Sequence, residues 1–217
     1  MTSYPSLINF WLALSVLGSM AVMGPAGAAV GIWLAGGRSW RLAFSWCLLF
    51  GAGMALVVAT KIAFIGWGIG VYSVQFAGFS GHAMRAGAVL PVFFFVLLKG
   101  ARPSWRWSGV LAGCLIAMLI TLSRLELRFH SVSEGVTGCL LGFLVAALFI
   151  WQALDVSAFV ISRTLVVLSF CCLLFAPKAE PVPTEDIITR VALRMSGHVK
   201  PFDREEWRIE QQRYLIR

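Results

Sequence analysis

Long runs of apolar residues constrain this chain more than any other feature, because about 20 such residues in a row can cross the hydrocarbon core of a bilayer. Six runs of roughly this length occupy residues 20–36, 41–63, 82–99, 107–123, 131–152 and 157–176. Of the 217 residues, 59% are hydrophobic and 13% are charged, whereas a soluble domain has about 25% charged residues. The sequence therefore predicts an integral membrane protein that folds as an all-α, polytopic bundle of about six transmembrane helices.

The positive charges predict how the spans are oriented. The connections between the first two spans and between the third and fourth hold the basic residues Arg38, Arg41, Lys99, Arg102 and Arg106. Cytoplasmic connections carry the excess of Lys and Arg, so both are expected in the cytoplasm. The 62–81 connection has no Lys or Arg and is expected outside. We thus expect a protein of a bacterial-type inner membrane, with both termini outside.

A change of composition divides the chain into a transmembrane domain, residues 1–176, and a polar tail, residues 177–217. The tail opens with a Pro-rich linker, PKAEPVPTED, and its next stretch predicts a short amphipathic helix between Thr184 and Gly197. Ile187, Val191 and Met195 share one face of that helix. We expect the helix to lie on the membrane surface or to pack on the domain, and docking of a partner is the alternative.

The net charge of +8 does not indicate a nucleic-acid partner. The tail is nearly balanced in charge, and most of the remaining basic residues flank apolar runs. Such flanking charge is typical of membrane orientation. The expected surroundings are therefore a bilayer, without nucleic acid.

Ionisable residues gather at span ends that alternation brings to one membrane face. They are Lys61 at the end of the second span, His82 at the start of the third, Ser123 and Arg124 at the end of the fourth, and His130 and Glu134 at the start of the fifth. Each alone has a structural alternative, such as a lysine that snorkels to the interface. Because ionisable groups at membrane depth are costly, their convergence on one face favours a functional site.

The residue types in this cluster predict chemistry on an anion. Lys61 and Arg124 are cations, and the Ser80–His82 segment opens a helix, where free backbone N–H groups favour a phosphate. His130 and Glu134 are four residues apart and share a helical face. The carboxylate can therefore orient the imidazole, as in activated nucleophiles. The sequence shows no Asp/Glu/His cluster suited to a metal, and it predicts phosphoryl transfer without a metal or other cofactor.

At these residues the chain resembles the type 2 phosphatidic acid phosphatase (PAP2) superfamily of membrane lipid phosphatases, whose motifs are K-x6-R-P, P-S-G-H and S-R-x5-H-x3-D. The third motif reads SRLELRFHSVSE here, with Glu134 where Asp is usual. The second reads FSGH, with Phe79 in place of Pro. The first keeps Lys61 but has Gly68 and Ile69 where Arg and Pro are usual. By motif, the resemblance covers about residues 61–134.

The resemblance implies roles for the matching residues. His130 would attack phosphorus and become a phosphohistidine, Glu134 would orient it, and His82 would protonate the leaving group. The residues implied to hold the phosphoryl oxygens are Lys61, Ser80, Gly81 through its backbone N–H, Ser123 and Arg124.

The arginine missing from the first motif leaves room for a substitute. Arg85 lies three residues after His82, on a similar helical face, and is a candidate to replace it. Contact with a lipid headgroup or a loop is the alternative for Arg85, and Arg128 is a second candidate.

We therefore expect a phosphatase that acts on a lipid phosphate or pyrophosphate at the periplasmic or exterior face. There the head group reaches water while the lipid tail stays between helices. Two alternatives remain open. One is a phosphotransferase that passes the phosphoryl group to another acceptor, and the other is a non-catalytic membrane protein that only binds a phospholipid, which the altered first motif favours.

Overall fold

The structure is a computed structural model of the chain, and it describes residues 5–156, 162–175, 184–204, 207 and 209. In chain order, its elements are α1 (Pro5–Leu17), α2 (Met20–Gly36), α3 (Trp40–Trp67), the 3-10 turn η1 (Tyr72–Val74), α4 (Gly81–Leu97), α5 (Pro103–Glu126), α6 (Val132–Leu154), α7 (Arg163–Phe175) and α8 (Thr184–Ser196). Within these described ranges the only β pairing is an isolated bridge between Val71 and Phe76. The predicted all-α class is confirmed.

Among the residues that the structure describes, four helical stretches are long and apolar enough to cross a membrane, namely residues 6–36, α3, α5 and α6. The predicted third and sixth spans correspond to α4 and α7, which have 17 and 13 residues in the described structure. At a rise of 1.5 Å per residue, α4 covers about 26 Å, somewhat less than a hydrocarbon core of about 30 Å. The structure thus establishes four candidate spans, and the predicted number of six is not confirmed.

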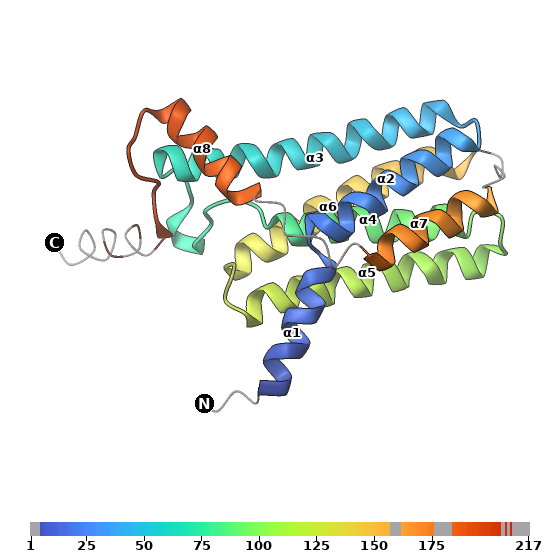
Figure 1. Ribbon diagram of the computed structural model, residues 1–217, viewed down its shortest axis with the longest axis horizontal. Helices are drawn as coiled ribbons and strands as arrows, with labels where there is room; N and C mark the ends of the chain where they lie inside the picture. The colour runs from blue at the N-terminus through green and yellow to red at the C-terminus, as the bar shows by residue number, and fades with distance from the viewer. Residues whose placement is uncertain (1–4, 157–161, 176–183, 205–206, 208, 210–217) are drawn as a thin grey trace.

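The N-terminal apolar stretch forms two helices. The chain turns at Gly18 and Ser19, between α1 and α2, whereas Pro25 lies inside α2. The break thus lies about two turns before the proline. Figure 1 shows α1 leaving the bundle at an angle to α2. Because the helix is broken here, the backbone carbonyl of Gly18 accepts hydrogen bonds from the guanidinium of Arg85 in α4.

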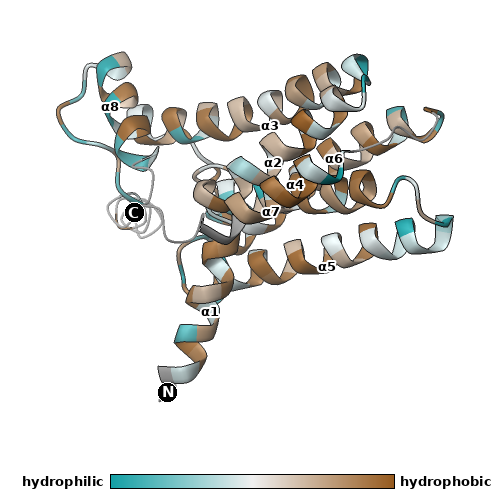
Figure 2. Cartoon of the chain, turned by 45° about the vertical axis from the view of Figure 1, so that its right-hand side comes forward, coloured by the Kyte–Doolittle hydropathy of each residue, from teal (hydrophilic) through white to brown (hydrophobic). Residues whose placement is uncertain are grey.

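The outer surface of the bundle is apolar, as Figure 2 shows along α3 and α5. Large side chains such as Phe44 and Trp151 are 71% and 69% exposed. Many others on the outer faces are also exposed, including Leu48, Leu111, Leu115, Leu140 and Leu144. Soluble monomers rarely expose contiguous apolar patches of this extent. The chain is therefore a membrane protein whose outer helical faces are suited to lipid.

Helix α4 lies at the centre of the bundle and fixes the position of the site (Figure 1). Thirteen of its 17 residues are buried. Helix α6 approaches it closely because two glycines lack side chains. A Cβ atom on Gly142 would lie 2.3 Å from the Met84 carbonyl oxygen, and one on Gly138 would lie 2.6 Å from that of Ser80. Small residues permit such contacts between membrane helices, and here they hold the start of α4 against the start of α6.

Helix α8 forms where the tail sequence predicts an amphipathic helix, and it packs on the end of α3 (Figure 1). Its buried residues are Ile188 and Ala192. The expected apolar face, formed by Ile187, Val191 and Met195, stays exposed. The packing face is thus displaced by one residue, because Ala192 and Ser196 fit closely against Gly66 of α3. Residues 176–183, which hold most of the predicted Pro-rich linker, lie outside the described residues.

Candidate active site

The helix ends that carry the predicted site residues lie toward the same end of the bundle. Figure 1 shows the end of α3, the start of α4, the end of α5 and the start of α6 on this side, with α8 beside them. The connections α2–α3 and α4–α5, which hold basic residues, lie at the opposite end. The alternation used in the sequence analysis therefore brings the polar motifs together in three dimensions.

His130 and Glu134 form a tight pair at the start of α6. Nδ1 of His130 lies 2.9 Å from Oε2 of Glu134, whose side chain is fully buried. The same carboxylate accepts a hydrogen bond from the backbone N–H of Ser131, while the Ser131 hydroxyl accepts one from the N–H of Glu134. This capping box satisfies two free donors of the helix start. The residues that begin α6 thus also aim the carboxylate at the imidazole.

The state of His130 follows from its surroundings. A carboxylate can only accept hydrogen bonds, so Nδ1 carries the proton and Nε2 keeps its lone pair. Burial lowers the pKa of His130 below its ordinary value, although the hydrogen bond and charge of Glu134 act to raise it. At neutral pH the imidazole is therefore uncharged, as a nucleophile must be.

The second motif is tied to the same carboxylate. The backbone N–H of Ala77 donates to Oε1 of Glu134 at 2.8 Å, and the N–H of Ser80 donates to the backbone oxygen of Glu134 at 3.1 Å. The side chain of Ser80 is fully buried, and its hydroxyl has no hydrogen-bond partner among the described residues. These contacts place the 77–82 segment, and with it His82, directly beside the start of α6.

The predicted cations approach from three different helices. Nζ of Lys61 lies 3.1 Å from Oε1 of Glu185 in α8. Nη1 of Arg124 donates to the Ser15 hydroxyl at 2.8 Å, and its Nε is buried without a partner among the described residues. The guanidinium of Arg85 is anchored by the carbonyl of Gly18, the residue at the break between α1 and α2.

Arg85 also belongs to the immediate surroundings of His82. Its Nη2 lies 3.4 Å from Nδ1 of His82 and 3.3 Å from the Gly18 carbonyl oxygen. Its Nη1 lies only 3.1 Å from where a Cβ atom on Gly81 would be. The sequence-predicted Arg85 is therefore held against the start of α4, beside the predicted acid.

Most of these residues line one or both of two adjoining cavities. The first, of about 400 Å³, is lined by Lys61, Arg124, His130, Glu185 and Arg204 together with apolar residues of α3, α8 and the tail. The second, of about 270 Å³, is lined by Lys61, Gly81, His82, Arg85 and Glu185 together with apolar residues of α1, α2 and α3. Lys61 and Glu185 line both. Their ion pair lies at the boundary between the cavity of His130 and the cavity of His82.

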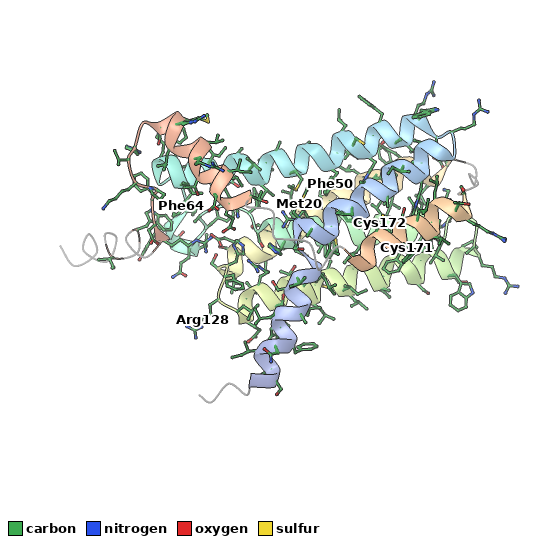
Figure 3. All side chains as sticks on the ribbon, viewed as in Figure 1. Met20, Phe50, Phe64, Arg128, Cys171 and Cys172 are labelled. Atoms are coloured by element: carbon green, nitrogen blue, oxygen red, sulfur yellow. The ribbon has the colours of Figure 1, made fainter. Side chains whose placement is uncertain are left out.

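Three of the predicted residues, Ser80, Ser123 and Arg128, line neither of these two cavities. The side chain of Ser123 is fully buried, and its hydroxyl donates to the Ile120 carbonyl oxygen at 2.6 Å within its own helix. Neither Ser80 nor Ser123 is among the residues that line the two cavities. Arg128, the second candidate substitute, is exposed (Figure 3), and it lines a third cavity together with His130 and Arg204.

Three charged residues that line the first cavity come from the tail, namely Glu185, Asp203 and Arg204, and the sequence alone did not reveal them. Besides Glu185, the tail contributes Arg204, whose Nη2 lies 2.8 Å from Oε2 of Glu134. No local spacing pattern could have revealed either contact, because their partners in α3 and α6 are more than 60 residues away in the sequence. Among the described residues, no three His, Cys, Asp or Glu side chains are grouped so that they could hold a metal ion.

Comparisons with known proteins identify a family and a relative. The family model of the PAP2 superfamily matches residues 68–157, which include the second and third motifs. A curated protein described as "Uncharacterized 22.5 kDa protein in cps region", from Klebsiella pneumoniae, is 33% identical over 205 residues, covering 90% of this chain and 96% of that protein. No solved structure gives a significant match.

Proposed function

We propose a specific chemistry for this chain, which belongs to the PAP2 superfamily: it hydrolyses a lipid phosphate or pyrophosphate monoester through a phosphohistidine, at the extracytoplasmic face of an inner membrane. Membership of the family by itself indicates a phosphatase-type activity. The observation that carries the finer proposal is the His130–Glu134 pair, whose imidazole lines a cavity together with Lys61 and Arg124.

In the first step, Nε2 of His130 attacks the phosphorus atom and forms an N–P bond while the bond from phosphorus to the leaving oxygen breaks. His82 transfers a proton to that oxygen, which leaves as an alcohol or a phosphate. Glu134 supports the positive charge that develops on the His130 ring, since Nδ1–H donates to its carboxylate. This is the arrangement of a nucleophile and an orienting group that covalent catalysis requires.

In the second step, water attacks the phosphorus of the phosphohistidine. His82, now without its proton, accepts one from that water, and the N–P bond breaks to regenerate His130. Inorganic phosphate leaves, and His82 is ready to act again as an acid. One pair of histidines thus serves both steps, with His82 alternating between acid and base.

The cations supply the electrostatic part of catalysis. Lys61, Arg85 and Arg124 neutralise the charge on the phosphoryl oxygens, which a site closed to water makes more effective. The carboxylate of Glu185 already lies among these charges, and Lys61 lowers the pKa of this carboxyl group below its ordinary value. A negatively charged group is therefore favoured here, which supports a phosphate-binding role for the cavity.

The second cavity supports a lipid as the substrate. Beside His82 and Arg85 it is lined by apolar side chains, Val16, Met20, Met54, Val57 and Val58. A lipid whose phosphate lies near the histidines can thus place the first carbon atoms of its chain against these residues. The basic α2–α3 and α4–α5 connections at the other end of the bundle favour an extracytoplasmic site by the positive-inside rule.

The proposal is tested by phosphate release from purified protein in detergent, over a panel of lipid phosphates and pyrophosphates, with His130→Ala as the control. We expect release from at least one lipid by the wild type, and a loss of at least about 10³-fold in the variant. Release should not depend on an added hydroxyl acceptor. An absolute need for an acceptor would instead identify a phosphotransferase, and no release from any substrate would contradict an enzymatic function.

A further inference from the structure

The three glycines of the GWGIG segment, Gly66, Gly68 and Gly70, all face the C-terminal tail. A Cβ atom on Gly66 would lie 3.2 Å from the Ala192 carbonyl oxygen. On Gly68 it would lie 2.9 Å from the ring of Phe202, and on Gly70 it would lie 3.1 Å from the ring of Trp207. At these three glycines the tail therefore packs directly against the backbone of the segment.

Specific contacts hold the tail on this surface. Nδ1 of His198 lies 2.7 Å from the Gly66 carbonyl oxygen, and the backbone N–H of Phe202 donates to the Ile65 carbonyl oxygen at 3.0 Å. The Trp207 ring packs edge-on against two aromatic rings, Phe64 at 5.3 Å and Tyr72 at 5.4 Å between centroids. Figure 3 shows Phe64 on the end of α3, beside α8. The tail is thus part of the folded site.

Gly68 is also the position at which the first motif lacks its arginine. Its φ of +67° lies in the left-handed region, which glycine adopts more readily than other residues. An arginine at this position would be strained and would collide with Phe202. The altered motif and the docked tail are therefore compatible with each other, whereas the usual arginine and the docked tail are not.

The docked tail brings a different arginine to the site. Two residues after Phe202, Arg204 lies with Nη2 2.8 Å from Oε2 of Glu134. Its side chain is 40% exposed, and it lines the cavity that also contains Lys61 and His130. A guanidinium has five donors in a planar fork, so contact with Glu134 leaves donors that can reach an anion in the same cavity.

We propose that Arg204, delivered by the docked tail, is a phosphate-binding residue that replaces the arginine missing at Gly68. The inference rests on the proposed function, because it assigns Arg204 to the same phosphoryl group that His130 attacks. When substrate binds, the guanidinium contacts Glu134 on one side and phosphoryl oxygens on the other. Arginine suits this role because its planar fork matches the geometry of phosphate oxygens.

The test compares Arg204→Gln with Arg194→Gln, which removes an exposed cation of α8 that lines neither cavity, and with Arg204→Lys. The dissociation constant of inorganic phosphate is measured by calorimetry on the full-length protein in detergent, and kcat and KM are measured by phosphate release. We expect Arg204→Gln to weaken phosphate binding about tenfold or more and to raise KM similarly. Arg204→Lys should recover part of the loss, and Arg194→Gln should match the wild type.

A different result would overturn the assignment. If Arg204→Gln lowered kcat but left phosphate binding and KM unchanged, Arg204 would only position Glu134. If all its constants equalled those of the wild type, Arg204 would have no part in the site. The binding measurement also separates this inference from the proposed function: wild-type protein that binds phosphate without hydrolysing any lipid would contradict the phosphatase, and the comparison with Arg204→Gln would still decide the role of Arg204.

A second variant, Phe202→Ala, tests the inference independently in case Arg204→Gln fails to fold. Phe202→Ala leaves Arg204 in place but removes the ring that covers Gly68. Because it loosens the segment that carries the guanidinium, we expect weaker phosphate binding in the same direction as Arg204→Gln. Unchanged phosphate binding in Phe202→Ala, with Arg204→Gln impaired, would show that docking on Gly68 does not position Arg204.

Discussion

The two halves of the proposed site are held together in different ways. In the α5–α6 half, formed by Arg124, His130 and Glu134, the contact between His130 and Glu134 and the capping box beside it join residues within four positions of one another. In the α3–tail half, formed by Lys61, Glu185 and Arg204, every key contact joins residues far apart in the chain. The first half should be rigid because the start of a helix builds it, and the second can change when the tail moves.

The largest effect is expected in the α5–α6 half. Glu134→Gln keeps the size of the side chain but removes the charge that supports the His130 imidazolium and fixes its tautomer. We expect kcat to fall by about 10² to 10⁴-fold. Phosphate release under saturating substrate measures it, with thermal unfolding as a check that the capping box still forms. A fall of less than tenfold would mean that Glu134 has only a structural role.

A smaller effect of opposite sign is expected in the α3–tail half. The carboxylate of Glu185 pairs with Lys61 at the boundary between the two cavities, so it competes with a phosphate for the same cation. Glu185→Gln should lower KM for a lipid phosphate by about two- to tenfold. The matched control is Asp186→Asn, one residue further along α8. A raised KM in Glu185→Gln would show instead that Glu185 helps to bind the substrate.

The pH dependence of kcat/KM tests whether Arg204, in the α3–tail half, acts on His130, in the α5–α6 half. Because burial keeps the pKa of His130 below its ordinary value, the acidic limb of kcat/KM in the wild type should lie below about pH 6.5. The charge of Arg204 is among the causes that lower this pKa. Arg204→Gln should therefore move the limb to higher pH, as a pH–rate profile would record. An unmoved limb would mean that the guanidinium does not act on His130.

The smallest effect is expected at Ser123, although it belongs to the best-matching motif. Its hydroxyl is buried and donates to a carbonyl of its own helix. Ser123→Ala should change kcat/KM by less than about threefold, because it removes only a hydrogen bond within α5. The same phosphate-release assay measures it. A tenfold loss would place the hydroxyl on the substrate during turnover.

Sequence reasoning reached the α5–α6 half because helix geometry is local. The four-residue spacing predicts that His130 and Glu134 meet, and the structure has them in contact, although His130 precedes the N-cap Ser131 and does not lie on a face of α6. The alternation of spans likewise brought Lys61 and His82 to the same end. The all-α class followed from apolar runs alone, since in a bilayer every backbone polar group must be satisfied within a helix or a closed barrel.

The contacts of the α3–tail half could not be predicted, because they depend on how α8 and the tail fit against the end of α3. Helix α8 buries Ile188 and Ala192, and its Ala192 and Ser196 lie close to Gly66, whereas hydrophobic periodicity alone favoured a neighbouring face. The predicted number of six spans is not confirmed, because α4 and α7 are shorter than the four candidate spans found among the described residues. Nothing in the local sequence connects Gly68 with Phe202, and so the tail's contribution appears only in three dimensions.

In the proposed mechanism, His130 receives the phosphoryl group in a pocket that His82 shares. It is tested most directly with His82→Ala and a nitrophenyl phosphate, whose good leaving group needs no acid, so that the first step proceeds while hydrolysis of the phosphohistidine is slowed. We expect a burst of nitrophenol equal in amount to the enzyme, and one added phosphoryl group on the peptide that contains His130, detected by mass spectrometry at alkaline pH. Phosphate release without any phosphoryl group on that peptide would contradict it.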